Sequence, residues 1–164
     1  LFRGLTLRAK IALKNGELKQ AEIDIKACED IAKKQKLDEF IIPALRGEWW
    51  LLKDNYKNAL SYLNTSINKY REMRDKDPDG KLKNIREKDR QDYYNILLLR
   101  ANVYFRMNSL EDALKDYEEA INFFPKKPAA FIQLGNYYKS QGDEKKAKES
   151  YQKAKDLEKT GHAK

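Results

Sequence analysis

Apolar residues in this chain recur at spacings of three, four and seven positions, which place side chains on one face of an α-helix. In residues 128–161 two such faces follow one another, with Gly142 and Asp143 as a turn between them. The first face carries Phe131, Leu134, Gly135 and Tyr138, and the second carries Ala147, Tyr151 and Ala154. The pattern predicts two antiparallel helices, in which small residues allow close approach and large residues fill the space between them.

The same pattern occurs 34 positions earlier in the chain. Asn102, Tyr104, Ala113, Tyr117 and Ala120 recur as Asn136, Tyr138, Ala147, Tyr151 and Ala154. A fixed period of this length predicts an all-α solenoid of stacked helix pairs. Less regular versions of the pattern extend it upstream, so the predicted repeats are 2–35, 40–73, 94–127 and 128–161 of a single domain spanning 1–164.

The period is interrupted between the second and third repeats by an insertion at 74–93. This segment contains Asp77-Pro78-Asp79-Gly80, which is a strong turn sequence. Because the helical pattern continues on both sides, one interpretation is two lengthened helices that meet at Pro78 and Asp79. The alternative is a disordered loop.

The repeat resembles the tetratricopeptide repeat (TPR), a unit of 34 residues that folds as helix–turn–helix. The matching residues are Leu134, Gly135, Tyr138, Gly142, Ala147, Tyr151 and Ala154 in the last unit, and Leu97, Ala101, Tyr104, Ala113, Tyr117, Ala120 and Pro125 in the unit before it. Arg100 departs from the pattern, because the family usually has leucine there. The resemblance implies a right-handed superhelical solenoid of about four repeats that acts as a non-catalytic scaffold and binds a protein or peptide in its concave groove.

In this family the groove is lined by outward-facing residues of the first helix of each repeat. The resemblance assigns this role to Lys10, Lys14, Glu48, Asn95, Leu98, Asn102, Phe105, Arg106, Ile132, Asn136 and Lys139. Asparagines would bond a peptide backbone, apolar residues would receive apolar side chains, and basic residues would attract acidic groups.

The formal charge of +8 gives weight to a second function, which is nucleic-acid binding through a basic surface. The candidate segment is 81–90, with Lys81, Lys83, Arg86, Lys88 and Arg90, although acidic residues are interleaved with them. A third interpretation is a sensor or assembly module of a larger regulator.

The sequence contains no recognisable catalytic or cofactor motif. The chain has one cysteine and one histidine, which excludes a zinc site built from those two residue types. Cys28 occupies a small-residue core position, and His162 lies in the tail. We therefore expect no enzyme activity, no cofactor and no metal. No apolar run is long enough to span a membrane, and the expected location is the cytoplasm, with the periplasm as the alternative.

The two ends of the array differ in their outward faces. Lys148 and Lys155 stand where the preceding repeat has Leu114 and Ile121, as expected for a solvated terminal repeat. Leu7 and Ile11, at the other end, are apolar at sites that face a preceding repeat. We expect an upstream domain or a second copy in a homodimer to cover them, and the chain to be the C-terminal part of a larger protein.

Overall fold

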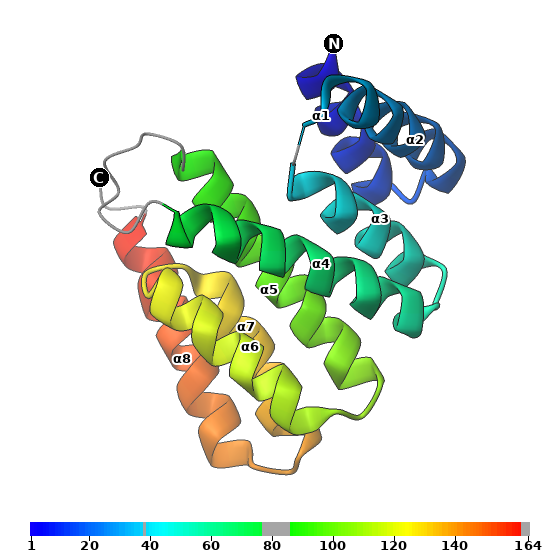
Figure 1. The fold of residues 1–164 in the computed structure, drawn as a ribbon. Coiled ribbons are helices and arrows are strands. Elements are labelled where there is room, and N and C mark those ends of the chain that lie inside the picture. The colour runs from blue at the N-terminus through cyan, green and yellow to red at the C-terminus, as the bar shows by residue number, and fades with distance from the viewer. Residues whose placement is uncertain (38, 77–85, 162–164) are drawn as a thin grey trace. The chain divides into compact units, whose positions relative to one another are not determined.

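The computed structural model describes residues 1–37, 39–76 and 86–161, and the regular structure in these ranges is α-helical (Figure 1). This confirms the predicted all-α class. Contacts divide the chain into two compact units, Leu1–Ile96 and Leu97–Lys164, with one helix running across the division. The helices are α1 (Phe2–Lys14), α2 (Leu18–Gln35), α3 (Ile41–Leu52), α4 (Tyr56–Asp75), α5 (Glu87–Arg106), α6 (Leu110–Phe123), α7 (Pro128–Ser140) and α8 (Glu144–Gly161).

Short turns join the two helices of each pair, and their residues explain where the helices begin and end. Gly16 and Gly142 both have φ of +74°, in the left-handed region that glycine adopts without a steric cost. The Asn55 side chain accepts a hydrogen bond from the backbone N–H three residues later, at 3.1 Å. Asp143 does the same before α8, at 3.0 Å. Each of these side chains satisfies an N–H group that the first helical turn leaves without a partner.

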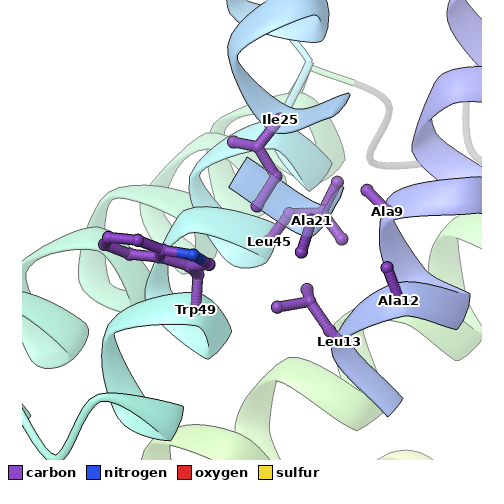
Figure 2. Close-up of a cluster of buried hydrophobic side chains, with 7 residues drawn as sticks. All are labelled: Ala9, Ala12, Leu13, Ala21, Ile25, Leu45 and Trp49. Carbon is purple, nitrogen blue, oxygen red and sulfur yellow. The ribbon is translucent and has the colours of Figure 1, made fainter. Parts of the chain in front are cut away.

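In the first unit, one buried cluster joins α1, α2 and α3 (Figure 2). The Trp49 indole N–H of α3 donates to the Leu18 carbonyl oxygen at 3.0 Å. On the same helix, Arg46 donates two hydrogen bonds to the Glu29 carboxylate of α2, at 2.9 and 2.6 Å. The buried side chains of the cluster are Ala9, Ala12, Leu13, Ala21, Ile25, Leu45 and Trp49.

Cys28 and an aromatic group complete the interior of the first unit. Tyr70 of α4 stacks on Tyr93 of α5 with ring centroids 4.0 Å apart, and Phe40 meets Tyr70 edge-on. Cys28 is fully buried, and burial raises the pKa of its thiol to about 11. Only the thiolate is a good nucleophile, and a thiol with this raised pKa stays protonated at physiological pH. Cys28 therefore acts as a core residue, as its position in the repeat predicts.

In the second unit, the α5–α6 contact contains a buried ion pair. Arg100 donates from Nε and Nη2 to the Asp116 carboxylate at 2.8 and 2.7 Å. Both side chains are nearly buried, at 12% and 5% exposure. The departure of Arg100 from the leucine of the family pattern therefore has a structural reason, since its charge is matched by Asp116 on the next helix.

The helices beside the insertion are long. α4 and α5 contain 20 residues each, whereas α1 and α7 contain 13. The predicted turn at Pro78 and Asp79 lies in 77–85, outside the described residues, so both interpretations of the insertion stay predictions. The boundaries of the four repeats also stay predictions.

Candidate functional site

An open pocket of about 300 Å³ lies in the second unit. Its lining comes mainly from α5 and α7, which are the first helices of two successive pairs. On each of these helices, spacings of three and four residues place the lining side chains on one face. The lining residues are Asn102, Phe105 and Arg106 from α5, Tyr117 from α6, and Gln133, Asn136 and Tyr137 from α7.

The polar part of the pocket is held in place by hydrogen bonds. Arg106 Nε donates to the Asn102 amide oxygen at 3.0 Å, and the Tyr151 hydroxyl donates to the Asn136 amide oxygen at 2.7 Å. Each asparagine thus uses its oxygen within the protein and has an NH₂ group with which to donate to a ligand. Asn136 and Arg106 are exposed, so the Asn136 amide and the Arg106 guanidinium are accessible from solvent.

The other side of the pocket is aromatic. The Tyr137 ring lies edge-on to Phe105 and Tyr117, with centroid distances of 6.4 and 6.3 Å. Burial, assisted by the Asp116 carboxylate, raises the pKa of Tyr117 to about 12. Burial also raises the pKa of Tyr137. Both phenols are therefore neutral at physiological pH, and this wall can pack against apolar groups.

The structure brings four of the predicted groove residues into this pocket: Asn102, Phe105, Arg106 and Asn136. Sequence reasoning missed Gln133, Tyr117 and Tyr137. Gln133 lies three positions before Asn136, and this spacing alone could have identified it. Tyr117 was interpreted as a core residue, and it is indeed 2% exposed, but its ring also lines the pocket.

The other predicted groove residues of this unit do not line the pocket. Leu98 packs against the core cluster around Ala101, and Ile132 is 37% exposed on α7. Lys139 lines a second open pocket of about 400 Å³, together with Lys148 and Lys155.

In the first unit, the predicted groove residues have different surroundings. Lys10 Nζ forms an ion pair with Asp92 at 2.6 Å. Burial raises the pKa of Glu48, while the charge of Lys10 lowers it. Lys14 and Asn95 are exposed, and the Asn95 amide oxygen accepts a hydrogen bond from Gln91 at 3.1 Å. Lys10 therefore already engages an acidic group of its own chain.

The basic segment considered for nucleic-acid binding is only partly described, because Lys81 and Lys83 lie outside the described residues. Arg86 donates two side-chain hydrogen bonds to Asp89, both at 2.9 Å, and Arg90 lies 3.7 Å from a Glu87 carboxylate oxygen. The arginines of this segment thus have acidic neighbours, which weakens their attraction for phosphate.

The described residues show neither a metal-binding cluster nor a membrane-spanning helix. In those ranges, no group of three or more His, Cys, Asp or Glu side chains is placed to hold a metal ion. None of the helices, over the same ranges, has both the length and the apolar character needed to cross a membrane.

Comparisons with known proteins found two family models that match parts of the second unit. A family model described as TPR repeat matches residues 101–142, and one described as Tetratricopeptide repeat matches residues 128–160. A comparison with curated proteins found no match.

Solved structures similar to this chain include those described as "Crystal structure of MamA" and "Crystal structure of BtubC (BKLC) from P. vanneervenii". The MamA structure has a TM-score of 0.69 and 16% identity, with 99% of this chain and 81% of that chain covered. The BtubC structure has a TM-score of 0.74 and 17% identity, and the match covers all of this chain but 65% of that one. At these identities the similarity concerns the fold alone, and it confirms the predicted helical solenoid.

Proposed function

Because residues 101–160 match models of the tetratricopeptide repeat, we propose that this chain is a non-catalytic scaffold that binds an extended segment of a partner protein in the α5–α7 pocket. The observation that carries the proposal is the convergence of Asn102, Asn136 and Gln133 beside an aromatic wall. An extended peptide has a free N–H and C=O at most positions, and each must find a partner when it is buried. Carboxamide groups can both donate and accept such bonds.

The pocket also favours particular side chains in the bound segment. Phe105 and Tyr137 offer apolar surface, so a large aliphatic or aromatic residue would gain by burial there. Arg106 lines the pocket, is exposed to solvent and would pair with a carboxylate. The ligand class that fits best is an extended segment with an apolar residue next to an acidic one.

The proposal can be tested with a displayed library of random peptides of about a dozen residues, from which binders are selected on the wild-type chain. A selected peptide is then titrated against the double variant Asn102→Ala with Asn136→Ala. Losing two hydrogen bonds of about 1 kcal/mol each would weaken binding by about 30-fold. The matched control is Asn68→Ala with Asn122→Ala, because these asparagines are exposed on α4 and α6 and line neither the α5–α7 pocket nor the second one.

We expect the control to bind like the wild type, and all three proteins to be folded with the same helix content. Equal affinity of the selected peptides for the wild type and the pocket variant would refute the proposed site. A library that yields no binder at all would count against peptide binding by this pocket.

A further inference from the structure

The outward face of α1 carries exposed apolar side chains at positions that are buried elsewhere. Leu7 and Ile11 are 57% and 51% exposed. Their counterparts 38 positions later, Leu45 and Trp49 on α3, are 1% and 5% exposed. The two helices thus present the same kind of surface, but among the described residues a neighbouring helix packs on the α3 surface and none covers Leu7 and Ile11. Val103 and Tyr137, which correspond to Ile11 in the later repeats, are also buried.

The neighbour that covers α3 shows what kind of partner this surface accepts. Ala21 and Ile25 of α2 pack in the same cluster as Leu45 and Trp49 (Figure 2). Beside this apolar contact, Glu29 of α2 receives two hydrogen bonds from Arg46. An amphipathic helix with an apolar stripe and a flanking carboxylate is therefore the occupant that this position accepts within the protein itself.

The charges on α1 complement an acidic partner. The helix contains Arg3, Arg8, Lys10 and Lys14 and no acidic residue. Arg8 corresponds to Arg46 and is 60% exposed. Its two bonds to Asp24 use Nε and Nη2, which leaves N–H groups of the guanidinium for a second carboxylate. A second copy would bring the same basic helix to the contact, and like charges would oppose its docking.

We propose that Leu7, Arg8 and Ile11 form a docking surface for an amphipathic helix of a partner protein, with acidic residues flanking its apolar stripe. This helix would lie on α1 as α2 lies on α3, with a carboxylate on Arg8. The surface, here called the α1 face, is separate from the α5–α7 pocket and would give the scaffold a second partner.

The probe for this proposal is a pair of synthetic helical peptides based on residues 18–35, because that helix already packs on the equivalent surface. Both peptides keep the apolar residues of α2 and replace the cysteine by serine. In one peptide the four lysines are changed to glutamate, and in the other the four acidic residues are changed to lysine. We expect the acidic peptide to bind at least about tenfold more tightly, with an affinity that falls as salt is added.

Variants of the full chain separate the α1 face from other surfaces. Leu7→Glu with Ile11→Glu should abolish binding of the acidic peptide, and it should fold normally because both side chains are exposed. The control is Ile23→Glu on α2, since Ile23 is 61% exposed and its counterparts Ser61, Lys115 and Glu149 are exposed too. The pocket variant Asn102→Ala with Asn136→Ala should bind the peptide as the wild type does.

Three results would overturn the proposal. The first is equal binding of the acidic and basic peptides, and the second is unchanged binding by the Leu7→Glu, Ile11→Glu variant. The third comes from sedimentation: the wild-type chain alone is a dimer, and the Leu7→Glu, Ile11→Glu variant is a monomer. In that case the α1 face would be covered by a second copy of the chain.

Discussion

The ion pair between Arg100 and Asp116 allows a sharp test of how the second unit is stabilised. The substitution Asp116→Ser removes the carboxylate and leaves the Arg100 guanidinium, whose side chain is only 12% exposed, without its two short bonds. Removing one member of a buried pair typically costs about 3–5 kcal/mol, because the remaining charge is left without compensation. For a chain of this length that loss corresponds to a fall in melting temperature of about 6–20 °C.

The last repeat supplies the matched control. The residues 34 positions later are Leu134 and Ser150, and the Ser150 hydroxyl donates to the Lys146 carbonyl oxygen at 2.9 Å. The last repeat therefore has uncharged residues at both of these positions. We expect the double variant Arg100→Leu with Asp116→Ser to regain most of the lost stability, to within about 1 kcal/mol of the wild type.

The assay is denaturant and thermal unfolding of the three proteins, followed by circular dichroism. The reasoning requires the single variant to be far less stable than the double variant. A single variant that loses under about 1 kcal/mol would contradict it, because leaving the Arg100 guanidinium without Asp116 would then cost little free energy. A double variant as unstable as the single one would also contradict it, because packing and not charge would explain the loss.

Three further predictions concern the first unit. In Gly47→Ala the new Cβ would lie 2.8 Å from Leu63 Cγ, so unfolding experiments should find a loss of about 1–3 kcal/mol. In Gly4→Ala the new Cβ meets open space, and the better helix propensity of alanine should stabilise α1 by up to about 1 kcal/mol. The bond from Arg8 lowers the pKa of Asp24 below its ordinary 3.8. The stability that Asp24 contributes should be fully present above pH 3.8 and lost as the pH falls through the lowered pKa, so the melting temperatures of the wild type and Asp24→Asn should converge in acid.

The sequence predicted the helices and turns well, because local signals determine them. The apolar periodicity identified the helical faces, and Gly142 stands in the turn where the sequence placed it. Arg100 was noticed only as a departure from the family pattern. Its pairing with Asp116 depends on how α5 crosses α6, and no local signal reports that crossing.

The candidate site was predicted in part for a related reason. The resemblance to the family identified Asn102, Phe105, Arg106 and Asn136, which line the pocket from α5 and α7. The alignment could not reveal that Lys10 would contact Asp92, 82 positions away, because Asp92 lies inside the 74–93 insertion, which the repeat pattern does not align. A position that lines the groove in the family can thus be engaged by the chain's own acidic residues here.

Three arginines at equivalent positions connect the internal packing with the proposed α1 face. Arg8 and Arg100 each pair with an aspartate 16 positions later on the following helix. Arg46 has Tyr62 at that spacing, so its guanidinium bonds instead to Glu29 on the preceding helix. The position can therefore bind a carboxylate on either side of its own helix. Arg8 already makes the first kind of contact, with Asp24 on the following helix. An acidic helix docked on α1 would add the second kind, the contact that Arg46 makes with Glu29 on the preceding helix.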